Sequence, residues 1–392
     1  MHSELCIKIA LYIFAIIGIF WCFVIGFDKI INFDLWQRRI HIGRWKDVDT
    51  WQLAVEKKCC QWLANTPVVP KNDSTRLVLF DRLSTNFSNT SIQSWQVAGL
   101  ILGLNAVAYR FPESVIQKII DKFNDNEHPD RALLSYALLG CQKQNASVKE
   151  FASTTRAIIE NHIVPDGTVA YRKHCAHIRF VDTIGLACPF LALDAVMSGD
   201  SKELELAEAQ IREYCQFLHP DSLLPPHAFN THNGMPLGVY DWGRGLGWFI
   251  LGIVECRRTL EKSAYDGDEF YKFLSNLVVQ LAEKVITLQH SNGGFAHFLS
   301  DTGNITEGSA TVLCGLLLED AYRLTQRQGF HDATDKAINA LMKITRRDGT
   351  LDMCQGDTKG VGVYSTQFAR MPFAQGLCLL LSHRFNEDAQ LG

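Results

Sequence analysis

The sequence has no excess of basic residues. Lysine and arginine together number 38 against 42 aspartates and glutamates, which gives a formal net charge of -4. A domain that binds nucleic acid is expected to present a basic face to the phosphates. We therefore exclude nucleic acid as a partner.

The sequence also lacks the short motifs that hold metals and phosphates. It has 12 cysteines, but no two of them are separated by two residues, so a zinc site has little support. Neither a Walker pattern nor a glycine fingerprint between a strand and a helix is present. Several cysteines lie within apolar stretches and are expected to be free thiols, which favours a reducing compartment.

Long strands with alternating polarity are absent too, and helical periodicity replaces them. Apolar residues recur three and four positions apart, as on one face of a helix. The segments with this pattern are 51–64, 92–111, 113–124, 129–143, 148–163, 181–198, 201–218, 242–262, 266–287, 306–327, 331–345 and 364–386. We expect an all-α protein.

The spacing of the most apolar helices predicts the architecture. They begin near 181, 242, 306 and 364, and an amphipathic helix lies between each pair. A helix that is apolar on all sides must be enclosed, whereas an amphipathic helix can face water. Six helical hairpins closed into a ring meet both needs. We predict an (α/α)6 barrel as a single domain over residues 51–392.

The N-terminus is a separate segment. Residues 9–27, "IALYIFAIIGIFWCFVIGF", carry no charge and approach the length of about 20 residues that crosses a bilayer as a helix. We predict a transmembrane anchor over 1–27 and a linker over 28–50; a cleaved signal peptide is the alternative. The expected location is a membrane, as a single-pass protein of the bacterial inner membrane. Basic residues after the apolar run, together with the cysteines, slightly favour a cytoplasmic barrel.

Long loops precede the inner helices and hold the candidate site residues. Such loops meet at one mouth of a barrel, where functional loops on rigid scaffolds gather. Asp182 begins an apolar helix, and its carboxylate is either a helix cap or a general acid/base tuned by partial burial. His227 lies in the next loop as a candidate substrate ligand.

The stretch "WGRGLGW" at 242–248 adds a cation and two aromatic rings. Arg244 at a helix N-terminus could grip a carboxylate with two hydrogen bonds. Trp242 and Trp248 could stack on a sugar, and the glycines would let the ligand approach the backbone. Tight packing between helices is the alternative explanation for these small and large residues.

Glu307, at the start of the expected helix 306–327, is the sixth candidate. It is a second carboxylate, a hydrogen-bonding group for the ligand, or a charge in the first turn of the helix. From the residues alone, these candidates predict a pocket for a polar small molecule, either anionic or resembling a sugar.

With these stretches in view, the sequence resembles the unsaturated glycuronyl hydrolases of glycoside hydrolase families 88 and 105, which include unsaturated rhamnogalacturonyl hydrolases. The resemblance covers about residues 90–385. The stretches that carry it are "VDTIGLACPFLA" at 181–192, "HAFNTHNG" at 227–234, "WGRGLGW" at 242–248, "TEGSATVLCGLLL" at 306–318 and "GVYSTQFARMPFAQGLCLLL" at 362–381.

The resemblance implies an (α/α)6 barrel and a hydration reaction. The substrate is an oligosaccharide or polysaccharide with a terminal uronic acid that has a double bond between C4 and C5. Asp182 matches the aspartate that protonates C4 and activates the water added at C5. His227 matches a pocket histidine, Arg244 the arginine that meets the uronate and Trp248 the adjacent aromatic. The resemblance implies no metal and no organic cofactor.

Two other functions stay open. A membrane-associated protein of exopolysaccharide or capsule biosynthesis could use the same fold to bind or trim a growing glycan. A sugar epimerase would need paired histidines in facing loops, for which His174, His177, His227 and His232 are candidates. Leu246 stands where the family has a polar or small residue, and we expect it to narrow the access or alter the substrate.

Overall fold

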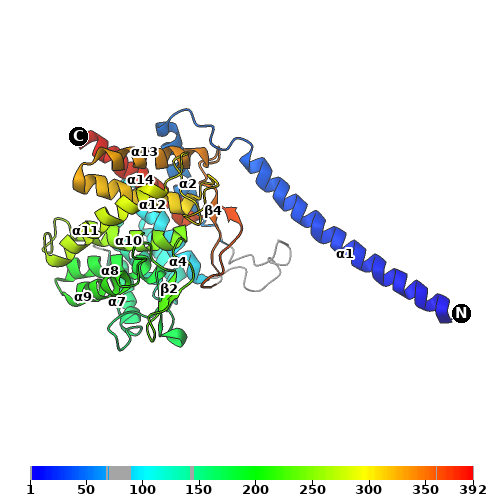
Figure 1. Ribbon diagram of the computed structural model, residues 1–392, viewed down its shortest axis with the longest axis horizontal. Coiled ribbons are helices and arrows are strands. Elements are labelled where there is room, and N and C mark those ends of the chain that lie inside the picture. Colours follow the sequence, from blue (N-terminus) through cyan, green and yellow to red (C-terminus); the bar gives the residue numbers. More distant parts are fainter. Residues whose placement is uncertain (1, 68, 70–89, 142–144, 359, 392) are drawn as a thin grey trace.

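The computed structural model describes residues 2–67, 69, 90–141, 145–358 and 360–391. Within them, twelve helices form two layers after a long N-terminal helix (Figure 1). The inner layer consists of α4 (Thr90–Ala106), α6 (Arg131–Cys141), α8 (Asp182–Ser198), α10 (Gly243–Leu260), α12 (Gly308–Thr325) and α14 (Pro372–Leu391). The outer layer consists of α2 (Val48–Ala64), α5 (Glu113–Phe123), α7 (Ala146–Glu160), α9 (Lys202–Cys215), α11 (Glu269–Val285) and α13 (Gln328–Lys343).

The inner helices form a closed ring. Each one contacts the next in chain order, and α14 returns to contact α4. Every residue from Thr183 to Ala195 of α8 is buried, whereas α5, α11 and α13 bury residues only on one side. This difference follows from hydropathy, because apolar helices need enclosure and amphipathic ones can face water. The predicted (α/α)6 barrel is confirmed.

Glycines allow the inner helices to approach closely. A Cβ atom on Gly376 of α14 would lie 1.9 Å from the carbonyl oxygen of Gly99 in α4. Between α8 and α10, a Cβ on Gly252 would lie 2.6 Å from the carbonyl oxygen of Ile184. Real Cβ atoms do not make such contacts, so these backbones pack against each other only because the side chains are missing.

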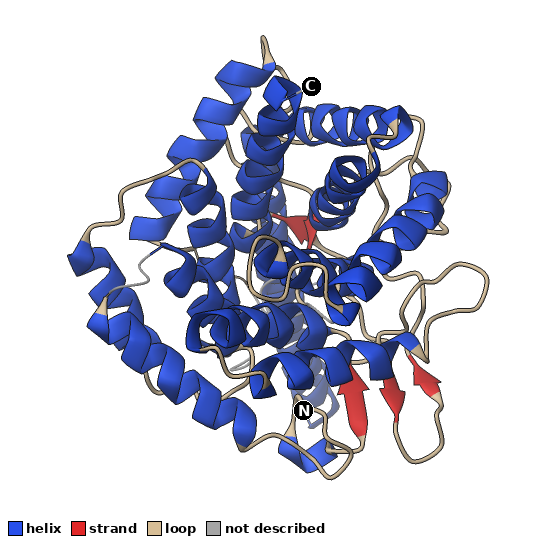
Figure 2. Cartoon of the chain, turned by 90° about the vertical axis from the view of Figure 1, so that its left-hand side faces the viewer, coloured by secondary structure: helices blue, strands red, loops and turns tan. Residues whose placement is uncertain are grey.

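Short strands connect the loops at the mouth of the barrel, which is formed by the N-terminal ends of the inner helices (Figure 2). One antiparallel sheet has the order β1 (Ile178–Phe180), β2 (Ala228–Asn230) and β3 (Pro236–Leu237). A second pairs β4 (Cys354–Gln355) with β5 (Phe368–Ala369). Single 3-10 turns occur at Lys173–Cys175 and Ile286–Leu288. These strands have only two or three residues, which is too short for alternation to reveal them in the sequence.

The N-terminal helix α1 (His2–Arg39) projects away from the barrel on the side where β4 lies (Figure 1). It is long and apolar enough to cross a membrane, and a signal sequence would pass the same test. Within the predicted linker over 28–50, the helix continues through residues 28–39, and α2 begins at Val48. An ion pair one turn apart, between Arg38 and Asp34, supports this continuation. The division at residues 27 and 50 stays a prediction.

Candidate active site

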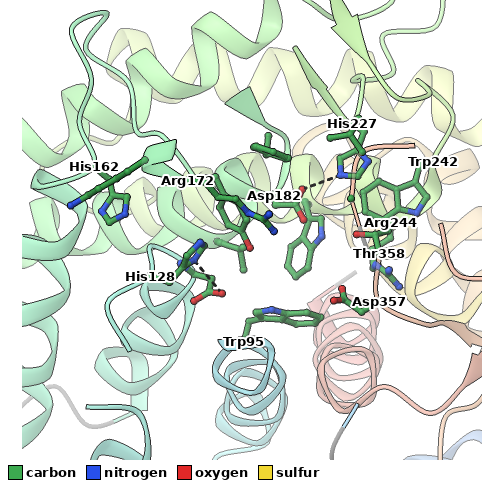
Figure 3. A pocket seen from close by; sticks show the side chains of 18 of the residues that line it. Trp95, His128, His162, Arg172, Asp182, His227, Trp242, Arg244, Asp357 and Thr358 are labelled. Atoms are coloured by element: carbon green, nitrogen blue, oxygen red, sulfur yellow. Dashed lines mark hydrogen bonds and ion pairs between the residues drawn. The ribbon is translucent and has the colours of Figure 1, made fainter. Parts of the chain in front are cut away.

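A pocket of about 480 Å³ opens at the mouth of the barrel (Figure 3). Five of the six predicted site residues line it, and Glu307 does not. Among the residues that the structure describes, the lining consists of Trp95, His128, Asp130, His162, Tyr171, Arg172, Lys173, His174, Phe180, Asp182, Leu186, His227, Trp242, Arg244, Trp248, Asp357, Thr358, Gly360 and Val361. Carboxylates, cations and aromatic rings therefore share one cavity, as in pockets that bind polar small molecules.

Asp182 is the first residue of α8, and strand pairing brings His227 to it. Phe180 of β1 pairs with Ala228 of β2, and the amide of Val181 donates to the carbonyl oxygen of His227 at 3.0 Å. The imidazole Nε2 of His227 then lies 3.7 Å from Oδ2 of Asp182 (Figure 3). Two loops from different hairpins thus place an acid and an imidazole side by side.

Burial changes the proton affinity of Asp182. Its side chain is 17% exposed, and its Oδ2 atom is buried without a hydrogen bond to any residue that the structure describes. Removal from water disfavours the carboxylate and raises the pKa to about 7; the charge of Asp357 raises it further, whereas Arg244 and Arg172 lower it. Both protonation states of Asp182 are therefore populated near neutral pH.

His227 has the opposite shift. Its side chain is buried, which disfavours the imidazolium, and Arg244 adds a repulsive charge; together they lower the pKa of His227 to about 3. The ring is therefore neutral at neutral pH. Its Nδ1 lies 3.2 Å from the hydroxyl of Tyr364, which fixes the orientation of the ring.

Arg244 lies in the first turn of α10 and is buried. Its Nη1 donates to the carbonyl oxygen of Gln355, and its Nη2 donates to that of Gly356 at 2.7 Å. The guanidinium also lies 5.3 Å from the centre of the Trp242 ring, within the range of cation–π attraction. A guanidinium has five N–H groups, so donors remain for an anion in the pocket.

Aromatic rings form one wall of the pocket. Trp248 and Trp95 meet edge to face, with their ring centres 5.3 Å apart, and Phe373 packs against both. Trp242 donates from Nε1 to the side-chain oxygen of Gln355 at 2.9 Å. Tryptophan faces held in fixed positions suit the apolar face of a sugar ring.

Glu307 lies outside the pocket and caps α12. Its carboxylate is fully buried and accepts hydrogen bonds from the amides of Ser309 and Ala310. It also accepts from the Ser309 hydroxyl at 2.8 Å and from the amide of Gln355 at 2.7 Å. Glu307 therefore supports the start of α12 and the β4 segment.

The glycines of "WGRGLGW" serve packing, which corrects the expectation that they admit a ligand. A Cβ on Gly245 would lie 2.5 Å from Cε3 of Trp242, and one on Gly247 would lie 2.3 Å from Cδ1 of Leu313. Leu246 is fully buried and does not line the pocket, so it does not narrow the access as expected. At Gly247 the contact is between helices, whereas at Gly245 it is with the ring of Trp242 just before α10.

No sequence motif pointed to several of the pocket residues. Trp95 resembles any core residue of an apolar helix, and Tyr171 and Arg172 lie in an unremarkable loop. Asp130 lies at the start of α6, where its carboxylate is 3.3 Å from His128. Asp357 follows β4, and the pairing of β4 with β5 helps to place that segment at the mouth. A high density of charge near a predicted mouth is the one signal that could have found them.

The histidines needed for an epimerase are not all in the pocket. His174 and His227 line it, whereas His177 and His232 stack on each other outside it, with ring centres 5.0 Å apart. Within the described residues, no group of three or more histidine, cysteine, aspartate or glutamate side chains could hold a metal ion.

Comparisons with known proteins agree with this fold. The chain is similar to a possible member of the GH105 family from Salmonella enterica, with 17% identity, a TM-score of 0.70 and coverage of 88% of this chain and 96% of that one. It is also similar to the unsaturated glucuronyl hydrolase of Bacillus sp. GL1, with 16% identity, a TM-score of 0.65 and coverage of 88% and 97%.

A third similar structure is the unsaturated glucuronyl hydrolase of Streptococcus agalactiae, with 14% identity, a TM-score of 0.63 and coverage of 88% and 94%. At such identities these likenesses show the fold alone. None of the curated proteins matches the chain. The model of Glycosyl Hydrolase Family 88 matches residues 113–386, which is more than half of the chain. The chain therefore belongs to Glycosyl Hydrolase Family 88 and is an enzyme of the glycoside hydrolase type.

Proposed function

We propose that the pocket hydrates the C4–C5 double bond of a terminal unsaturated uronic acid and thereby releases that sugar from a glycan. The observation that carries the proposal is Asp182, whose pKa of about 7 and buried oxygen without a hydrogen bond in the described residues suit a group that first gives and then takes a proton. The names of two similar structures, both unsaturated glucuronyl hydrolases, support the same substrate class.

Proton transfer begins the reaction. The protonated carboxyl of Asp182 gives its proton to C4, and the electrons of the double bond form the new C–H bond. The positive charge that develops at C5 is shared with the ring oxygen. Asp182 is then a carboxylate beside this cation, and the attraction lowers the energy of the transition state.

Water addition completes the catalytic cycle. A water molecule attacks C5 and gives its proton to Asp182, which returns the side chain to its starting state. The resulting hemiketal opens between C5 and the ring oxygen, and the hemiacetal left at C1 releases the rest of the glycan as an alcohol. Neutral His227, 3.7 Å from Asp182, can accept a hydrogen bond from this water or donate one to the carboxylate.

Substrate binding is assigned to Arg244 and the aromatic wall. The remaining N–H groups of Arg244 bind the uronate carboxylate, because a guanidinium matches a carboxylate in charge and geometry. Trp248 lies against the sugar ring, and the ring of Trp242 stabilises the position of the Arg244 guanidinium by a cation–π contact. Figure 3 shows His227 between Asp182 and Trp242.

The test uses the full chain in detergent with unsaturated disaccharides made by a polysaccharide lyase. Loss of the absorbance of the conjugated double bond follows the reaction. We expect loss with the unchanged protein and a decrease in kcat of at least about a thousandfold in Asp182→Asn, which cannot donate the proton. Asp194→Asn is the matched control, because Asp194 lies on the same helix but pairs with Arg156 outside the pocket. Equal rates in the two variants would refute the role of Asp182.

The N-terminal helix supports a proposal about location. The side chains of α1 from Ile9 to Ile25 carry no charge and, apart from Val24, are exposed, so they would need lipid around them. We propose a single-pass membrane protein whose barrel lies on the cytoplasmic side. Residues 28–39 extend the helix by only about 18 Å beyond the apolar run, which keeps the barrel close to the bilayer.

This location favours a second candidate function, the trimming or binding of a growing membrane-attached polysaccharide. The two functions differ in substrate. Soluble lyase products should suffice for the first, whereas the second requires a glycan that lacks the C4–C5 double bond. Turnover or tight binding of saturated glycan by Asp182→Asn would favour the second candidate.

A further inference from the structure

Arg39, the last residue of α1, is joined to the barrel by a bidentate ion pair. Arg39 donates from Nε to Oδ2 of Asp352 at 2.7 Å and from Nη2 to Oδ1 at 2.8 Å. The same Nη2 donates to the carbonyl oxygen of Phe368 in β5 at 2.7 Å. Asp352 is fully buried and also pairs with Arg346 at 2.6 Å. A bidentate pair with a buried carboxylate is strong and fixed in direction.

Asp352 begins the segment that shapes one side of the pocket. Two residues later the chain enters β4, and the carbonyl oxygens of Gln355 and Gly356 hold Arg244 in place. The next residue, Asp357, lines the pocket and raises the pKa of Asp182. A continuous path of hydrogen bonds and peptide bonds therefore runs from Arg39 to the candidate carboxylate-binding group.

The connection after α1 is fixed to the same region. The amide of Gly43 donates to the carbonyl oxygen of Thr345 at 2.9 Å, and Trp45 donates to that oxygen from Nε1 at 3.2 Å. Gly43 has a φ of 71°, and a Cβ there would lie 2.4 Å from the carbonyl oxygen of Lys343. These contacts hold the end of α1 in a fixed position against the barrel.

We propose that Arg39 is a positioning residue for the active site: it fixes the 352–357 segment and, through that segment, the guanidinium of Arg244. The end of α1 and the wall of the substrate pocket are then held in a fixed relative position. Cleavage anywhere between the apolar run and Arg39 would leave the contact intact, but loss of Arg39 itself would loosen the pocket wall. The expected effect on substrate binding rests on the proposed function. The link from Arg39 to the 352–357 segment does not.

The neighbouring arginine provides a matched control. Arg38 pairs only one turn back with Asp34, and both side chains are more than half exposed. Arg39→Gln and Arg38→Gln therefore remove the same charge from adjacent positions, but only the first should release Asp352. Arg39→Lys keeps the charge and can restore one of the two bonds to Asp352, so it should recover part of the effect.

The experiment measures hydrogen exchange and kinetics on the full chain in detergent. In Arg39→Gln we expect faster exchange at the amides of Gln355 and Gly356, which donate to Glu307 and to the carbonyl oxygen of Gln367, while α8 and α10 keep their protection. With a lyase-derived unsaturated disaccharide we expect KM to rise about tenfold and kcat to change little, because carboxylate binding is what weakens. The exchange rates and KM of Arg39→Lys should lie between those of Arg39→Gln and the unchanged protein. Those of Arg38→Gln should match the unchanged protein.

Two results would overturn the proposal. One is equal exchange and equal KM in Arg39→Gln and Arg38→Gln. The other is faster exchange spread evenly over the whole barrel, which would show a general loss of stability. If the unchanged protein has no activity on unsaturated uronides, the proposed function fails, but the exchange comparison still decides whether Arg39 positions the segment.

Discussion

Asp182 and His227 lie side by side with pKa values shifted in opposite directions. Burial raises the pKa of the carboxyl to about 7 and lowers that of the imidazole to about 3. At neutral pH the pair therefore consists of a carboxyl that can donate a proton and a ring without charge. Opposed shifts in adjacent groups are a common sign of acid and base roles.

The pH dependence of kcat/KM follows from these values. The free enzyme must hold the proton on Asp182, so kcat/KM should be level below pH 7 and fall about tenfold per pH unit above it. His227 stays neutral across this range and should add no acidic limb above about pH 4. A pH profile with an unsaturated disaccharide measures this directly.

The variant Asp357→Asn tests what raises the pKa of Asp182. The charge of Asp357 raises the pKa of Asp182, so its removal should move the inflection of the profile to lower pH. An unchanged inflection, or a profile that rises with pH through 7, would contradict the assignment of Asp182 as the acid.

Arg244 gives a second prediction at this scale. If its guanidinium binds the uronate, Arg244→Met should raise KM for the unsaturated disaccharide about a hundredfold, because a buried charged hydrogen bond is lost. The methyl ester of the same disaccharide has no carboxylate charge, and its KM should change much less. An equal rise for acid and ester would mean that Arg244 only supports the pocket wall.

Of the five lining residues that the sequence indicated, four lie at or near the start of an inner helix, and His227 lies in the long loop before α10. The sequence could not locate Asp357, whose place depends on the pairing of two strands of two residues each. Nor could it separate Trp95 from core tryptophans, since the face of an inner helix that meets a pocket is as apolar as the face that meets a neighbour.

At the scale of elements, the helices followed from periodicity, but their close contacts did not. Apolar patterning predicts which helices are enclosed, whereas the distance between them depends on which glycines face each other. In "WGRGLGW" the pattern suggested access for a ligand, and the structure instead shows contacts with Trp242 and Leu313. A glycine in a sequence does not say what lies opposite it.

This assignment predicts the effect of adding one methyl group. Gly247→Ala places a Cβ 2.3 Å from Cδ1 and 3.1 Å from Cβ of Leu313, so the Leu313 side chain or the two helices must shift, and we expect the free energy of unfolding to fall by about 1–3 kcal/mol. Gly329→Ala in α13 is the control, because nothing lies within 4 Å of its Cβ position and alanine favours a helix. Denaturant titration of both variants measures the difference; similar values would refute the packing role.

At the scale of the whole molecule, a closed barrel is joined to one long apolar helix. The sequence predicted both parts, because hydropathy reports burial and membrane length alike. It did not predict that α1 continues to Arg39 and makes an ion pair with Asp352, since a contact between residues so far apart leaves no local pattern.

Membrane attachment is tested on the expressed full chain. We expect the protein to stay with the membrane fraction after an alkaline wash, to be released by detergent and to retain residues 9–27, because an exposed apolar helix of this length partitions into lipid. Mass spectrometry of the mature N-terminus checks retention. A soluble protein that begins after residue 27 would establish a cleaved signal peptide instead.

The most direct test of the account is the fate of the double bond in heavy water. The full chain is incubated in heavy water with a lyase-derived unsaturated disaccharide, and the products are followed by NMR. Protonation at C4 predicts one deuteron at C4 of the released sugar, loss of the vinylic signal and no reaction in Asp182→Asn. Release of a sugar that keeps its double bond and carries no deuteron at C4 would contradict the hydration mechanism.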